Sequence, residues 1–386
     1  MRRAFRRAGA LGIAAMVLAL MTTIASADGP GYETVSQDFN NLLFGLNVGS
    51  GDELIVAEAG NGAVELDPDD GDKTLLGSLP GISDVIQIGR REYLAVTGGG
   101  DPTDASAASL YRIKNGNVTK IADLGAFEAA VDPAGDEPES NPFDLAKWRG
   151  GKAFVADAAG NSILAVDRNG NVDWVASLPQ HLVSTQPLKD AVGCPNAPPD
   201  LAEFCDLPEM FEADPVATTV AIGPDGAIYA GELTGFPATP GTSRVWRIEP
   251  DARHVKCLED NDEDDDCTLV ETPPFTSIID INFGEDGTAY VLELDEASWL
   301  AAENGQGVGG TVNACRSHGD GDDEDVDNGA AWSCEEIATG LPFPLAVAID
   351  DESVYVTINH GFEGPFEVAL LTNGDGGEGN GDEDDD

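Results

Sequence analysis

Short apolar stretches separated by turn residues run along most of the chain, and the same unit recurs. IVAEAGNGAVELD (residues 55–67) and FVADAAGNSILAVD (154–167) both read as a strand, a tight turn and a second strand. The tripeptides PDG and EDG in later copies supply the positive φ that a tight hairpin needs. The pattern predicts six antiparallel units of three to four strands. The other copies are VAIGPDGAIYAGELTGFP (220–237), INFGEDGTAYVLELDEASW (281–299), VAIDDESVYVTINHG (347–361) and, more weakly, QIGRREYLAVTGGG (87–100).

Six such units indicate an all-β fold, a six-bladed β-propeller of four-stranded antiparallel blades. One blade cannot bury both faces of its sheet, so neighbouring blades stack around an axis and share a core. The last copy lacks a fourth strand, and YETVSQ (32–37) is expected to supply it and close the ring. A seventh blade within 181–214 is the competing interpretation. That stretch is Pro-rich and contains two cysteines, which favours an insertion loop.

The two ends of the chain are expected to lie outside the propeller, which spans residues 28–373. Residues 1–27 combine a basic start, an apolar run and the small residues Ala25-Ser26-Ala27, which is typical of a signal peptide. Arg2-Arg3 also fits a twin-arginine signal, so both export routes stay open. Residues 374–386 form an acidic tail that we expect to be disordered. The mature protein is predicted to be secreted, extracellular or periplasmic, with no membrane span after signal cleavage.

Charge narrows the range of partners. The chain carries 71 Asp+Glu and 20 Lys+Arg, a formal net charge of −51. Nucleic-acid binding needs clustered cations, so this class of function is excluded. Such self-repulsion is relieved by salt or by bound cations, and a halophilic setting and a calcium-rich setting both fit.

The six cysteines fall into three near-neighbour pairs. Fifteen connectivities are possible, and the simplest joins Cys194–Cys205, Cys257–Cys267 and Cys315–Cys334. These pairs would close insertions near 181–214, 257–267 and 315–334. None of the cysteines is spaced CxxC and the chain has only four His, which argues against zinc.

Three stretches carry a resemblance to a known family: SNPFDLAKWRGGKAFVADAAGNSILAVDRNG, VATTVAIGPDGAIYAGELTGFP and TSIIDINFGEDGTAYVLELD. Together they resemble the ScyD/ScyE family of secreted propeller-like proteins, over about residues 42–373. The resemblance implies an exported six-bladed propeller similar to NHL-type and gluconolactonase-like propellers. It implies no catalytic residues. The first blade departs from the family, because it reads FNNLLFGLNVG where an NPRGLAFG-like phrase is expected.

Acids recur at one position of the repeat. Aligning the copies on their second strand superimposes Glu58, Thr97, Asp157, Glu232, Glu293 and Ile358. Equivalent positions lie on a ring about the propeller axis, and converging carboxylates suit Ca²⁺, which takes six to eight oxygen ligands. Glu58, Asp157, Glu232 and Glu293 are therefore candidate metal ligands. The alternative is that each acid caps the turn at its own second strand or bonds the N–H groups of a neighbouring blade.

A second candidate calcium site is the loop at residues 320–329, DGDDEDVDNG, which lies between Cys315 and Cys334. Asp323, Asp325 and Asp327 alternate as in calcium loops, but the Gly falls one place late and Cys334 stands where the bidentate Glu belongs. It is not an EF-hand. A looser calcium loop and a solvated acidic loop both remain open, as they do for residues 257–267 and for the tail.

No nucleophile elbow, P-loop, HExxH or GxGxxG motif is present. Carboxylate pairs such as Asp144 with Asp157, or Glu232 with Asp280, are possible acid–base groups without support from spacing. Three functions remain. The first is a non-enzymatic extracellular binding or scaffold module that we expect calcium to stabilise and whose partner is a protein, a glycan or a small molecule. The others are a metal-dependent hydrolase or lactonase with a cation in the central channel, and a structural matrix component.

Overall fold

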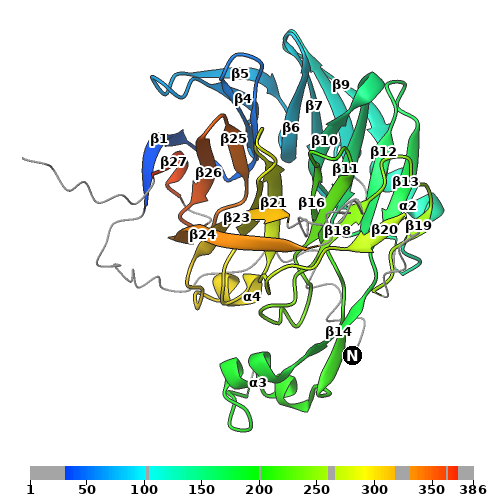
Figure 1. The fold of residues 1–386 in the computed structure, drawn as a ribbon, viewed down its shortest axis with the longest axis vertical. Helices are drawn as coiled ribbons and strands as arrows, with labels where there is room; N and C mark the ends of the chain where they lie inside the picture. The colour runs from blue at the N-terminus through cyan, green and yellow to red at the C-terminus, as the bar shows by residue number, and fades with distance from the viewer. Residues whose placement is uncertain are drawn as a thin grey trace, which may run out of the picture.

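Six small sheets follow one another around a common axis in the computed structural model (Figure 1). The model describes residues 31–372 except 101–103, 137, 200, 260–265, 318–330 and 362–363. The innermost strands contact each other in sequence, and the last contacts the first, so the ring is closed. This confirms the predicted six-bladed β-propeller.

The first three blades contain four antiparallel strands each, and the third gains one more. Their strands, from the axis outward, are β2 (Leu43–Val48), β3 (Leu54–Glu58), β4 (Gly62–Leu66) and β5 (Lys73–Ser78) in blade 1; β6 (Ile82–Gly89), β7 (Glu92–Thr97), β8 (Ser109–Lys114) and β9 (Asn117–Asp123) in blade 2; and β10 (Pro142–Trp148), β11 (Lys152–Asp157), β12 (Ser162–Val166) and β13 (Val172–Ser177) in blade 3. β19 (Val255–Lys256) pairs in parallel with β13 and makes blade 3 five-stranded.

The N-terminal strand completes the last blade, as the sequence predicted. The strands, from the axis outward, are β16 (Ala217–Ile222), β17 (Ile228–Glu232), β18 (Val245–Ile248) and β20 (Cys267–Leu269) in blade 4; β21 (Ile278–Phe283), β22 (Ala289–Glu293), β23 (Gly310–Ser317) and β24 (Trp332–Leu341) in blade 5; and β25 (Val347–Asp350), β26 (Ser353–Asn359), β27 (Phe366–Leu371) and β1 (Tyr32–Phe39) in blade 6. β1 runs antiparallel to β27, with Thr34 opposite Ala369. Figure 1 shows the first and last strands side by side.

The core consists of six apolar clusters, one between each pair of adjacent blades. Residues that alternate along a strand face opposite neighbours: Val56 packs toward blade 6, while Ile55 and Ala57 pack toward blade 2. Every residue of β3 and of β17 is buried for this reason. The stacking of blades thus explains why second strands are continuously apolar up to their final acid.

Glycines form the tight turns between first and second strands. Gly226 in PDG has φ +83° and Gly287 in EDG has φ +85°, a region that residues with a Cβ rarely adopt. Both turns are those expected from the sequence.

Additional elements are short. They are α2 (Leu124–Val131), η1 (Arg149–Gly151), α3 (Gln186–Val192), η2 (Ala202–Asp206) and α4 (Trp299–Glu303). The stretch 181–214 differs from the expected loop, because β14 (His181–Ser184) and β15 (Met210–Ala213) pair as a separate two-stranded sheet. It is not a seventh blade, and we call residues 181–213 the arm. The arm projects away from the propeller body (Figure 1).

All three predicted disulfides are present. Cys194–Cys205 closes the arm, Cys257–Cys267 ties β19 to the outer strand of blade 4, and Cys315–Cys334 joins directly opposed residues of blade 5. Across the described ranges, no helix has both the length and the apolar character needed to cross a membrane. The predicted signal peptide (1–27), the acidic tail (374–386) and Asp323, Asp325 and Asp327 lie outside the described residues.

Candidate functional site

The innermost strands carry polar residues at one equivalent position facing the channel. In each innermost strand, one core residue pairs with the middle residue of the second strand, and the position lies directly before it. In blades 2 to 5 this position holds Asp84, Asp144, Thr219 and Asp280. We call these four residues the channel ring. In blade 1 the same position is Gly45, where a Cβ would lie 2.1 Å from Asp84 Oδ1. A side chain at Gly45 would therefore displace the acid beside it.

Each ring residue fastens its blade to the next one. The backbone N–H of Leu145 donates to Asp84 Oδ2 (3.1 Å), and that of Val220 donates to Asp144 Oδ2 (2.7 Å). The same relation joins Ile281 N to Thr219 Oγ1 (3.0 Å) and Val347 N to Asp280 Oδ2 (2.8 Å). Innermost strands have no further strand to pair with, and a buried N–H without an acceptor is costly. The ring supplies these acceptors across four blade junctions.

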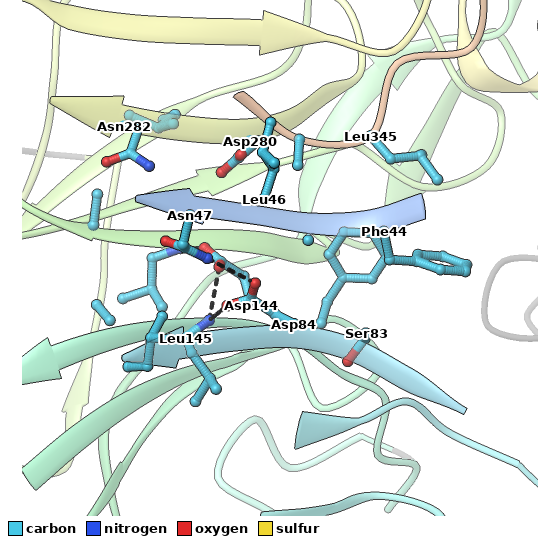
Figure 2. A pocket seen from close by; sticks show the side chains of 18 of the residues that line it. Phe44, Leu46, Asn47, Ser83, Asp84, Asp144, Leu145, Asp280, Asn282 and Leu345 are labelled. Atoms are coloured by element: carbon cyan, nitrogen blue, oxygen red, sulfur yellow. Dashed lines mark hydrogen bonds between the residues drawn. The ribbon is translucent and has the colours of Figure 1, made fainter. Parts of the chain in front are cut away.

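The ring carboxyls also keep their protons to a higher pH than ordinary carboxyl groups do. Thr219 Oγ1 lies 3.0 Å from Asp144 Oδ2 and 3.1 Å from Asp280 Oδ1, yet a hydroxyl has one hydrogen to donate. The second contact is therefore satisfied only when that carboxyl is protonated. Asp84 and Asp144 also lie side by side (Figure 2), and the backbone N–H of Leu145 donates to both carboxyl groups (3.1 and 2.7 Å). Burial raises the pKa of Asp144 to about 6. Burial and the charge of Asp144 raise the pKa of Asp84 and of Asp280 well above the usual range.

The ring faces a cavity of ≈ 360 Å³ along the axis, lined by residues of all six blades. Figure 2 shows Asp84 and Asp144 beside Asn47, whose amide donates to Asp84 Oδ1 (3.0 Å). Phe44 and Phe143 meet edge to face nearby, with ring centroids 6.0 Å apart. Ser83 is the one serine that lines the cavity, and its hydroxyl donates to the carbonyl of Pro142 (2.8 Å). That serine is not paired with a base, so it is not set up as a nucleophile.

We expect Asp280→Asn to keep the fastening role and Asp280→Ala to lose it. The Asn amide can accept from Val347 N–H and donate to Thr219, whereas Ala leaves the N–H without an acceptor, a loss of about 1–3 kcal/mol. A raised carboxyl pKa contributes stability that is complete below the unfolded pKa and disappears as the pH rises through the folded pKa. The fall in melting temperature between about pH 5 and about pH 8 should therefore be smaller in Asp280→Asn than in the wild type. Identical melting temperatures for Ala and Asn variants would contradict the fastening role.

The acids of the second strands sit apart from this ring, and Glu58 and Asp157 bond within their own blades. Glu58 accepts from the backbone of Asn40 (2.9 Å) and from the side chain of Asn61 (2.9 Å). Asp157 accepts from Ser140 Oγ (2.6 Å), and from two backbone N–H groups. These contacts match the turn-capping alternative for both acids.

Glu232 and Glu293 are similarly occupied. Glu232 is fully buried and forms a bidentate pair with Arg244, while Trp246 Nε1 donates to its Oε2 (3.2 Å). Burial raises its pKa to about 7 although Arg244 opposes the shift. Glu293 accepts from the backbone of Thr276 and from Asn313 Nδ2 (2.8 Å), and burial raises its pKa to about 7.

The four predicted ligands therefore have separate sets of partners. Among the residues that the structure describes, no three His, Cys, Asp or Glu side chains gather in a way that could hold a metal ion. Calcium binding by these acids stays a prediction, as it does for Asp323, Asp325 and Asp327.

Sequence reasoning missed the channel ring. It paired Asp144 with Asp157 and Glu232 with Asp280, whereas the structure brings Asp144 to Asp84 and, through Thr219, to Asp280. The signal was present in the first strands, where SDV, FDL, TTV and IDI share the polar residue before a core residue. Aligning the copies only on their second strands hid it.

No protein-family model matches the sequence, and no curated protein sequence matches it. Among solved structures, the chain is similar to the calcium-binding protein regucalcin from Agrobacterium tumefaciens, with 13% identity and a TM-score of 0.51 over 87% of this chain and 92% of that one. A protein of unknown function from Bacteroides thetaiotaomicron gives 11% identity and a TM-score of 0.50, over 89% and 72%. A gluconolactonase from Xanthomonas campestris gives 11% and 0.48, over 89% and 88%. At these identities the similarity shows the fold alone.

Proposed function

We propose that this chain is an exported propeller of the ScyD/ScyE type that works as an extracellular binding module, with calcium as a stabiliser. The observation that carries the proposal is the arm. Its two strands present an apolar face that the propeller leaves uncovered, on an element that a disulfide closes. Calcium-binding regucalcin shares the fold, which makes calcium the first ion to test.

The arm has one anchored face and one open face. Val183 is buried, and Phe211 packs edge to face on Phe236 with centroids 5.4 Å apart. On the other face, Leu182 is 63% exposed and Met210 is 48% exposed. Leu182 is opposite Glu212 and Ser184 is opposite Met210, so the two apolar side chains are diagonal neighbours. A folded, disulfide-closed element that displays apolar groups is typical of a contact surface.

Charge indicates what the arm binds. Exposed Glu209 and Glu212 flank Met210, and the whole chain has a net charge of −51. A partner must therefore offer apolar side chains framed by Lys or Arg, and we propose a protein surface of that kind. Electrostatic attraction of this type increases association rates and weakens with salt.

The hydrolase alternative requires a cation in the channel with three or four ligands and one open position. The channel acids fit this poorly. Each already accepts a backbone N–H of the next blade, and no three potential ligands gather in the described residues. We derive no hydrolytic step for this reason.

Photo-crosslinking tests the proposal. We expect a photoreactive amino acid at Leu182 or Met210 to give one discrete adduct in the exported fraction of producing cells. Leu75 on β5 is 50% exposed and serves as the matched control. The adduct at Leu182 should disappear in a Met210→Glu background and weaken at high salt. Equal adducts at positions 182 and 75, or an adduct that survives Met210→Glu, would contradict the proposal.

A further inference from the structure

Glu128 is a buried carboxyl without a hydrogen-bond donor. It lies in the middle of α2, which connects blades 2 and 3 and is capped at its start by Asp123 (Ala126 N to Oδ1, 2.8 Å). Its side chain is 0% exposed, and neither carboxyl oxygen has a partner among the described residues. A charged carboxylate in this state is strongly unfavourable, so another group must compensate it.

A second buried carboxyl flanks the same small space. A Cβ built on Gly160 would lie 3.1 Å from Glu128 Cδ, 3.1 Å from Glu128 Oε2 and 3.1 Å from Asp157 Cγ. The two carboxyl groups therefore meet at the point that the missing side chain of Gly160 leaves open. Asp157 Oδ1 accepts two backbone N–H groups and Oδ2 accepts Ser140 Oγ (2.6 Å), and the backbone N–H of Ala159 also donates to this carboxylate.

No positive side chain neutralises this pair. Within the described chain, no ion pair includes Glu128 or Asp157, and Asp132 and Asp136 add negative charge beside Glu128. Lys256 Nζ lies 3.9 Å from a Cβ built on Gly135, but it forms no ion pair with Glu128 or Asp157 among the described residues. The compensating group is then either a proton or a cation from solution.

We propose that a hard divalent cation, calcium, binds between Glu128 and Asp157 at Gly160. Calcium accepts carboxylate oxygens in flexible geometry and completes its shell with water, so two carboxylates are sufficient for a site of modest affinity. Two carboxylates and one Ca²⁺ are also neutral as a group, which removes the penalty on both acids. The ion joins α2 to the turn after β11 and so links blades 2 and 3. The inference rests on the calcium part of the proposed function and gives that ion a location, whereas it does not depend on the arm or on its partner.

Calorimetric titration of the mature chain with calcium, after removal of bound metal with EDTA, tests the site. We expect the wild type to bind one ion at this site and to melt at a higher temperature with calcium. Glu128→Gln should weaken this binding at least tenfold and remove the calcium-dependent rise in melting temperature. Glu303→Gln is the matched control. Burial raises the pKa of Glu303 on α4, and no neighbouring carboxylate contributes to that shift.

A second variant keeps the charges and removes the space. Gly160→Ala places its Cβ against both carboxyl groups, so it should also weaken calcium binding, and it keeps the test valid if Glu128→Gln does not fold. If Glu128 holds only a proton, Glu128→Gln will be as stable as the wild type or more so, with unchanged calcium binding. That result overturns the proposal. Calcium binding that stays intact in both Gly160→Ala and Glu128→Gln also overturns it, because the ion would then be bound by other acids.

Discussion

A chain that begins at Asn40, and so lacks β1, is expected to lose the cooperative unfolding transition of the full domain. β1 is the outer strand of blade 6, and the chain continues from it directly into β2, the inner strand of blade 1. Its removal exposes the edge of β27 and takes buried Phe39 from the cluster between blades 6 and 1. Domain stabilities are about 5–15 kcal/mol, and loss of a whole strand with its ring closure is of that order. Thermal unfolding followed by circular dichroism measures the effect.

The matched control for this truncation is Thr34→Val. It removes only the bond from Thr34 Oγ1 to Glu367 Oε2 (2.7 Å) and should cost about 1 kcal/mol. A truncated chain that melts at the temperature of the full domain would show that the blade 6–blade 1 junction holds without β1. Asn359, which bonds both N–H and C=O of Leu43 (2.9 and 3.1 Å), would then be sufficient for closure.

Arg244→Met is expected to destabilise the protein by about 3–5 kcal/mol, because it leaves Glu232 buried without its counter-charge. Arg244 also donates to the carbonyl of Pro179 (2.7 Å), and its guanidinium lies 5.1 Å from the Trp246 ring centroid. Glu232 can escape the penalty only by taking a proton, so the loss of stability should be larger at about pH 8 than at about pH 5. Denaturant unfolding at the two pH values measures this difference.

The double variant with Glu232→Gln separates charge from packing. Once the acid is neutral, Arg244→Met should cost markedly less than it does beside Glu232. Equal costs in both backgrounds would mean that Arg244 acts through packing alone. His181 provides an internal check: its Nδ1 is 3.8 Å from Glu232 Oε1, and burial and Arg244 lower its pKa to about 4. Its pKa should rise when Arg244 is removed.

The blades were predictable because their strands are encoded locally. Each unit has its own apolar alternation and its own Gly turn, and the missing fourth strand of the last copy indicated that β1 closes the ring. β19 was not predictable. It pairs in parallel with blade 3 although it follows blade 4 strand β18, and two residues leave no periodic pattern. The arm strands were also missed, since their four-residue lengths are hidden among prolines and cysteines.

The candidate sites were less predictable because their partners come from other blades or from distant loops. The repeat placed Glu58, Asp157 and Glu232 at one position correctly, but not the residues that bond them. The charge of Glu232 is neutralised by Arg244, which comes just before the next strand. Asp157 instead faces Glu128, which lies on the helix between blades 2 and 3. The same acid position therefore has a different electrostatic environment in each blade. Only the packing of the six blades against one another determines which buried carboxyl has no donor or positive charge beside it.

Hydrogen exchange most directly tests whether the arm is the binding surface. Tagged protein would be labelled alone and after incubation with the exported fraction of producing cells. The account predicts slower exchange in residues 181–184 and 210–213, with the channel strands unchanged. Slower exchange in β6, β10 and β21 around the channel, with the arm unchanged, would contradict it and would place the ligand at the propeller axis.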